Sequence, residues 1–182
     1  MIVLGKKIKL NEKGFTLIET LTYLFIMSML ILIMSSLMLN IFNTRKMMIS
    51  SHRVHDNARF IVNYLNNRIH NVDVIDDVSP QPEILHFYQL PGTRFSISAE
   101  NNDLIFRQVE DIGAGFPDQS TAEVISLNSA NINLDNLSLT SVTDPLGSTN
   151  QGVRISFTLS IGSVGDKYGY LQKTFTTFIS LR

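Results

Sequence analysis

The chain has 182 residues, of which 17% are charged and 44% are hydrophobic, and its formal net charge at pH 7 is −1. These totals allow one modest domain with an appendage. With no cysteine in the chain, they exclude disulfide scaffolds, thiolate metal sites and cysteine nucleophiles. The balanced charge gives no bulk attraction for nucleic acid.

The first 14 residues are predicted to form a basic leader. They hold four lysines and a single acidic residue, and these are Lys6, Lys7, Lys9, Lys13 and Glu12. The N-terminus is therefore positive, and the remainder of the chain is negative.

An apolar segment follows, and we predict a membrane helix over residues 15–44. From Thr20 to Thr44 there are 25 positions without a charged residue, a helical length of roughly 37 Å. A bilayer core needs about 20 such residues. Apolar side chains cover every side, whereas a helix on a globular core would keep a polar face. A secretory signal peptide does not fit, because its apolar core is about 7 to 15 residues long and ends in a small-residue cleavage site.

The lysines before this segment set its expected direction. By the positive-inside tendency, the N-terminus lies in the cytoplasm and the C-terminal part lies outside. Arg45 and Lys46 follow the segment, and they weaken the contrast without reversing it.

Beyond the apolar segment the helical pattern continues as an amphipathic helix over residues 45–71. Its apolar positions recur every three or four residues, and they are Val54, Ala58, Ile61, Leu65, Ile69 and Val72. Glycine and proline are absent between Phe15 and Pro80. We therefore expect one helix from Phe15 to about Asn71, whose second half docks on a domain.

Residues 72–182 are predicted to form a β-rich globular domain. The expected strands are 84–90, 93–99, 104–109, 122–127, 132–139, 153–161 and 170–182. Asn101 and Asn102 mark a hairpin turn, and a glycine-rich connection over residues 162–169 marks another. The prediction is an α+β fold in which a long N-terminal helix packs on a twisted, mostly antiparallel β-sheet.

The residues give little support for enzyme or metal chemistry. His52, His55 and Asp56 can share a helix face, but further ligands are missing and a solvated face is the simpler explanation. His70 and His86 are isolated. Neither acidic cluster, at 73–77 or 103–111, has the alternating pattern of a calcium loop. We predict no enzyme activity, cofactor, metal or direct small-molecule or nucleic-acid partner.

The sequence "GFTLIE", residues 14–19, lies between the basic leader and the apolar helix. This arrangement resembles the type IV prepilin signal of pilins, type II secretion pseudopilins and competence pseudopilins. The resemblance implies that a prepilin peptidase cleaves after Gly14 and N-methylates Phe15. It also implies that Glu19 pairs with the N-terminal amine of a neighbouring subunit during filament assembly. The partners would be that peptidase, other pilins or pseudopilins, and membrane lipid before assembly.

An isolated carboxylate supports the same role on physical grounds, because at the centre of a membrane helix it costs about 2.5 to 3.5 kcal/mol. The alternative is that Glu19 lies at the headgroup level and gains from the helix dipole. Major pilins often carry a kinking proline and a disulfide loop, and this chain has neither, which favours a minor subunit. The competing function is a single-pass anchored extracytoplasmic binding or adhesion domain that joins no filament.

Overall fold

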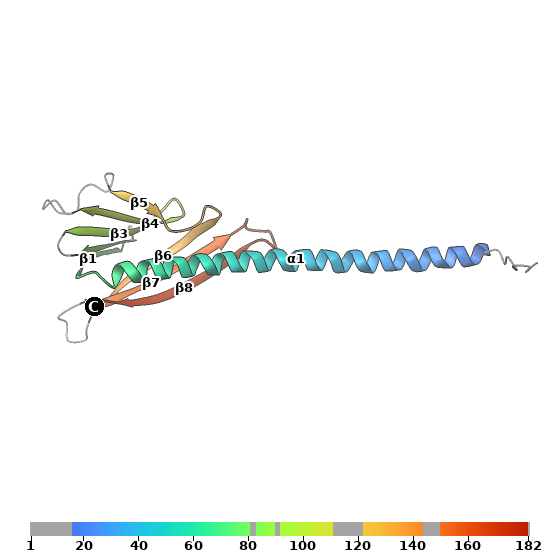
Figure 1. Cartoon of the computed structure of the whole chain (residues 1–182), viewed down its shortest axis with the longest axis horizontal. Helices are drawn as coiled ribbons and strands as arrows, with labels where there is room; N and C mark the ends of the chain where they lie inside the picture. Colours follow the sequence, from blue (N-terminus) through green and yellow to red (C-terminus); the bar gives the residue numbers. More distant parts are fainter. Residues whose placement is uncertain (1–15, 81–82, 90–91, 111–121, 144–149, 182) are drawn as a thin grey trace, which may run out of the picture. The chain divides into compact units, whose positions relative to one another are not determined.

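The computed structural model describes residues 16–80, 83–89, 92–110, 122–143 and 150–181. Within these residues the chain forms one helix and eight strands (Figure 1). The chain divides into two compact units, Met1–Asn43 and Thr44–Arg182. The first unit holds the apolar part of the helix, and the second holds the rest of the helix and all the strands.

Helix α1 spans Leu17–Ile69 without interruption, close to the predicted range. In the second unit it is amphipathic as predicted. The whole predicted apolar stripe is buried, with exposed fractions from 0% to 3%, and it consists of Val54, Ala58, Ile61, Leu65, Ile69 and Val72. These side chains belong to one hydrophobic core together with residues of both sheets.

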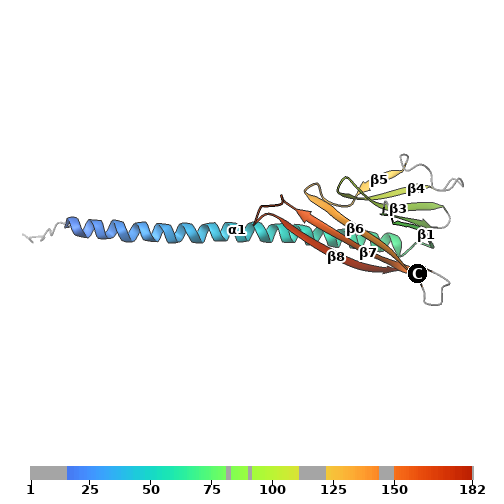
Figure 2. The ribbon, with the colours of Figure 1, turned by 180° about the vertical axis from the view of Figure 1, so that it is seen from behind.

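The strands form two antiparallel sheets. The first sheet has the order β1-β2-β3-β4-β5, and its strands are β1 (Val74–Pro80), β2 (Glu83–Gln89), β3 (Thr93–Glu100), β4 (Asp103–Glu110) and β5 (Glu123–Ser126). The second sheet has the order β6-β7-β8, and its strands are β6 (Ile132–Thr143), β7 (Asn150–Ile161) and β8 (Leu171–Ser180). Figure 2 shows the second sheet beside the C-terminal half of α1.

The predicted α+β class and antiparallel pairing are confirmed, but two details differ. The strands make two sheets where one was expected. Strand β1 was not predicted, because it contains Asp76, Asp77 and Pro80 and therefore resembles a loop in sequence. A register shift between Ile75 and Asp77 also breaks its period-two alternation. The acidic residues and the proline are tolerated because β1 is an edge strand.

Both predicted turns are present. Asn101 and Asn102 have φ values of 51° and 67°, and they connect Glu100 to the directly paired Asp103. Two positive φ values in a two-residue loop fit the twist of a hairpin. In the β7–β8 connection Gly162 has φ +85°, and a Cβ there would overlap the carbonyl oxygen of Gly169. Glycine is therefore required at this close approach.

Aromatic contacts join α1 to both sheets. The ring of Tyr64 meets Phe106 of β4 edge-on, with centroids 5.2 Å apart. His55 meets Phe175 of β8 in the same manner at 5.6 Å. Phe175 in turn stacks on Phe157 of β7 at 5.7 Å. The helix is therefore fixed from two sides by ring packing as well as by its aliphatic stripe.

A buried amide holds the two sheets together. Asn128, in the segment between β5 and β6, accepts a hydrogen bond from the Leu104 N–H of β4 at 2.8 Å. Its amide nitrogen donates to the Ile132 carbonyl of β6 at 2.5 Å and to the Asp103 carboxylate at 2.7 Å. Because its donors and acceptor are all used, this asparagine is stable in the interior.

An ion pair in the first sheet joins neighbouring strands. The guanidinium of Arg107 donates to both carboxylate oxygens of Glu100, at 2.5 and 2.6 Å. This hydrogen bonding lowers the pKa of Glu100 and raises the pKa of Arg107. A hydrogen bond to the Ser98 hydroxyl completes the group. The two-point geometry fixes the β3–β4 hairpin near its turn.

The core predicts a clear contrast between two phenylalanines on adjacent strands. Phe157 is 1% exposed and Phe178 is 50% exposed. Phe157→Ala should lower the free energy of unfolding by about 3 to 5 kcal/mol, because it removes a buried ring and leaves a cavity. Chemical denaturation of the full chain in detergent micelles measures this change. Phe178→Ala is the matched control, and an equal loss there would contradict the assigned core.

Candidate functional site

The start of α1 is capped by Thr16. Its hydroxyl oxygen accepts a hydrogen bond from the Glu19 N–H at 3.3 Å, and its carbonyl oxygen accepts from the same N–H at 3.0 Å. A threonine at the cap with a glutamate three residues later is the capping-box pattern. The sequence "TLIE" contains this signal, but Thr16 was not predicted to have a role.

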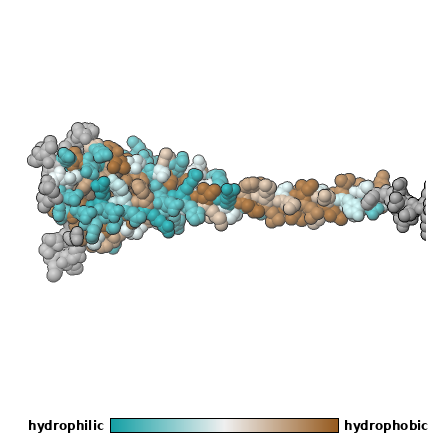
Figure 3. Space-filling view, in the orientation of Figure 1, coloured by the Kyte–Doolittle hydropathy of each residue, from teal (hydrophilic) through white to brown (hydrophobic). Residues whose placement is uncertain are grey.

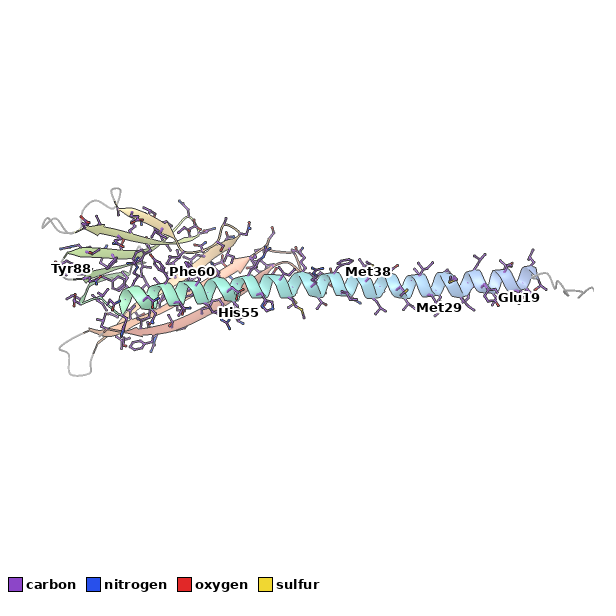
Figure 4. The ribbon with its side chains drawn as sticks, in the orientation of Figure 1. Glu19, Met29, Met38, His55, Phe60 and Tyr88 are labelled. Carbon is purple, nitrogen blue, oxygen red and sulfur yellow. The ribbon has the colours of Figure 1, made fainter. Side chains whose placement is uncertain are left out.

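The Glu19 carboxylate is not used by this cap. Among the residues that the structure describes, it has no hydrogen-bond or ion-pair partner; Figure 4 shows its place in the first turns of α1. The predicted processing residues Gly14 and Phe15 lie outside the described residues. The pairing role of Glu19 therefore stays a prediction.

The first part of α1 carries large hydrophobic side chains on all sides. Figure 3 shows them along the face in view. Exposed fractions run from 47% to 80% for Leu17, Ile18, Leu21, Tyr23, Leu24, Phe25, Ile26, Met27, Met29, Leu30, Ile31, Leu32, Ile33, Met34, Leu37, Met38, Leu39, Ile41 and Phe42. Covering one such side chain contributes about 1.5 to 3 kcal/mol. The described part of the chain supplies no cover, so lipid or other proteins must supply it.

Three hydroxyl groups in this segment donate hydrogen bonds to carbonyl oxygens of the same helix. The side chains of Thr20, Thr22 and Ser28 donate to the carbonyl oxygens of Leu17, Ile18 and Phe25 at 2.8 to 2.9 Å. These donors require neither water nor a partner. They therefore suit a helix placed in lipid or packed among other helices.

In length and composition, α1 is long and apolar enough to cross a membrane. None of the residues in its most apolar stretch is buried against another part of the described chain. A core helix of a soluble protein would be covered on at least one side. The predicted transmembrane helix is supported on both counts.

A second polar group lies near the start of the docked half of α1. The ammonium of Lys46 contacts the Asp166 carboxylate of the β7–β8 loop at 2.6 Å. The other carboxylate oxygen accepts from the N–H groups of Tyr168 and Gly169 at 3.2 and 3.0 Å. A Cβ at Gly169 would overlap the side-chain ends of Asp166 and Lys46, so a larger residue there would require these two side chains to shift. Sequence reasoning missed this pair, because 120 residues separate its members.

The Lys46–Asp166 pair lowers the pKa of the Asp166 carboxyl group. The hydrogen bond from Lys46 holds the pKa of Asp166 below its ordinary value of 3.8, and the Tyr168 N–H adds to the effect. Both groups are exposed, so the pair orders the loop and contributes little to stability.

The histidines of α1 do not form a metal centre in the structure. Among the described residues, no group of three or more His, Asp or Glu side chains is arranged to hold a metal ion. His55 instead accepts a hydrogen bond from the ammonium of Lys173, with 2.9 Å between Nε2 and Nζ. Its ring also packs against Phe175. These contacts give His55 a structural role.

The Lys46–Asp166 pair predicts a pH dependence. Because the folded-state pKa of Asp166 is lowered, its contribution to stability is complete above the ordinary value and is lost as the pH falls through the lowered value. Near pH 7 the melting temperature of the wild type should therefore lie slightly above that of Asp166→Asn. This difference should shrink toward pH 3. Thermal melts across this range test it, with Glu123→Gln as the charge-matched control. A difference that is constant with pH would contradict the assignment.

Comparison with known proteins bears on the N-terminus. Residues 9–35 match the family model for the prokaryotic N-terminal methylation motif. The matched range contains Gly14, Phe15, Thr16 and Glu19 together with the first turns of α1. The resemblance found in the sequence is thereby confirmed. No curated protein and no solved structure matches the chain.

Proposed function

We propose that this type IV pilin-like chain is a minor pilin or pseudopilin, a structural subunit of a type IV pilus, type II secretion or competence filament. The observation that carries the proposal is an apolar helix without cover in the chain, whose first turn holds one carboxylate without a partner among the described residues. Such a helix is suited first to lipid and then to a bundle of similar helices. The subunit has no catalytic role.

Processing would create the missing partner of Glu19. Cleavage after Gly14 by a prepilin peptidase leaves Phe15 as the first residue and its amine as a new cation, and N-methylation keeps the positive charge. Phe15 precedes Glu19 by four residues in the sequence. In a bundle, the carboxylate of one subunit and the amine of the next can neutralise each other.

The physical chemistry of this pair would set the axial offset between subunits. An ion pair in a water-poor bundle gains little net stability, but removing one member strands the other and costs about 3 to 5 kcal/mol. Helix surfaces covered mainly by Leu, Ile and Met slide with little penalty, since their contacts lack direction. The pair therefore supplies the directional contact that the apolar surface lacks.

The proposal assigns a role to each of four segments of the chain. Residues 1–14 are the leader, 15–44 the membrane and filament-core helix, 45–71 its amphipathic continuation, and 72–182 the extracytoplasmic domain. The leader lysines keep the N-terminus in the cytoplasm. The subunit is stored in the cytoplasmic membrane and then moves into a filament in the periplasm or at the cell surface. The absence of cysteine and of a helix proline favours a minor subunit.

Processing predicts a defined N-terminus. Co-expression of the chain with a prepilin peptidase should yield a protein that starts at Phe15 and carries one added methyl group on its amine. Mass spectrometry of the intact protein and of its N-terminal peptide measures both changes. Gly14→Val is the control, because a β-branched side chain at the cleavage position should block the reaction. A chain that still starts at Met1, or is cut elsewhere, would rule out the pilin role and leave a permanently anchored binding domain.

Assembly predicts a separate effect at Glu19. Glu19→Ala should be cleaved normally, because the cut lies five residues upstream, but its incorporation into filaments should fall at least about tenfold, as expected for a loss above 1.4 kcal/mol. Quantitative immunoblotting of sheared filaments against the membrane fraction measures incorporation. Glu123→Ala removes an exposed carboxylate from β5 and should assemble like wild type. Equal incorporation of the two variants would exclude the ion-pair role.

A further inference from the structure

Strand β8 is the outer strand of the second sheet and has a free edge. The strand order is β6-β7-β8, and no strand in the described part of the chain pairs with the other side of β8. Its ten residues pair with β7 in continuous register from Leu171 to Ser180. By contrast, the β1–β2 and β6–β7 pairings both contain register shifts. A regular edge of this length, about 33 Å, is a template for a further strand.

The composition of β8 gives this edge little protection. Its sequence "LQKTFTTFIS" contains one charged residue, Lys173, and no proline. Its four β-branched residues and two phenylalanines favour extended structure. Proteins usually block such edges with charges, prolines or bulges, because a free edge binds other chains. The exception here suggests that the edge is used.

A groove lies beside this edge, between β8 and α1. Its volume is about 420 Å³. Ala58, Val62 and Phe175 supply apolar surface, and His55, Arg59 and Lys173 supply basic or polar groups. None of the residues that line it is acidic. Figure 4 shows His55 at the part of α1 that faces β8, where its contacts with Lys173 and Phe175 lie.

The charges of the groove select the occupant. Arg59 and Lys173 are exposed cations without an ion pair among the described residues. In a strand added to β8, alternate side chains would point to the α1 side of the sheet, where these cations lie. Carboxylates at those positions would be attracted, and lysines would be repelled. The groove thus matches an extended segment with acidic residues at alternate positions.

We propose that β8 and this groove bind an extended, acidic polypeptide segment of a partner protein, which adds a strand to the β6-β7-β8 sheet. Main-chain hydrogen bonds to the β8 edge would supply affinity, and the groove would supply specificity. A second copy of the chain fits less well. Two β8 strands paired about a two-fold axis would place Arg59 and Lys173 of both copies on the same side of the joint sheet. The proposal is independent of N-terminal processing and of Glu19.

The test uses the full chain in detergent micelles and a fluorescently labelled, blocked octapeptide of alternating Val and Glu. Fluorescence anisotropy should show saturable binding. The neutral Val–Gln peptide should bind about tenfold more weakly, because each surface ion pair contributes a few-fold, and the Val–Lys peptide weaker still. The Val–Glu peptide methylated at every backbone nitrogen should not bind, since it cannot donate to the edge.

Charge reversal sharpens the test. The double substitution Lys173→Glu and Arg59→Glu should reverse the preference, so that Val–Lys binds better than Val–Glu. Lys167→Glu makes the same type of change in the β7–β8 loop and should leave the preference unaltered. Equal binding of the three peptides, binding of the methylated peptide, or no binding of Val–Glu at its solubility limit would overturn the proposal. Self-association of the wild type that Thr176→Pro abolishes would also overturn it, because a second copy would then occupy the edge.

Discussion

The apolar surface of α1 from Leu17 to Phe42 is the constraint on which the rest of this molecule depends. No described part of the chain covers it, and its exposure to water would cost tens of kcal/mol at about 1.5 to 3 kcal/mol for each side chain. This helix is therefore stable only where lipid or other helices cover it. The polar groups of the segment fit both surroundings, because three of its hydroxyls bond to carbonyl oxygens of their own helix.

Glu19 is the exception in this segment, and the helix cap clarifies its role. A carboxylate in the first turn gains from the helix dipole, by about 0.3 to 1 kcal/mol at an exposed site. That gain is smaller than the cost of about 2.5 to 3.5 kcal/mol for a charge at the centre of a membrane. The Thr16 side chain accepts the Glu19 N–H, and among the described residues the Glu19 carboxylate accepts no hydrogen bond in return. This carboxylate remains available to a cation from another molecule.

Much of this fold follows from periodicity in the sequence. The buried stripe of α1 and the alternating strand β7 were predicted, since each has a single buried, apolar face. The division into two sheets was not predicted, because it depends on β6 not pairing with β5. Asn128 uses its side chain to bond Leu104 and Ile132, and no local pattern reveals that choice. Strand β1 was missed because its aspartates are acceptable only at a sheet edge, and edge position is a property of the assembled sheet.

Some residues of the candidate site could be predicted from the sequence, and others could not. Gly14, Phe15 and Glu19 lie in one local motif, so a single sequence window is enough to predict roles for them. The Lys46–Asp166 pair and the His55–Lys173 contact join residues more than 100 positions apart, and only the folded chain brings them together. An apolar helix also recognises other helices with little selectivity, since its contacts are non-directional. Any discrimination between partners must therefore come from directional groups. Outside Glu19 these groups lie in the domain, at the Lys46–Asp166 pair, the sheet edges and the groove beside β8.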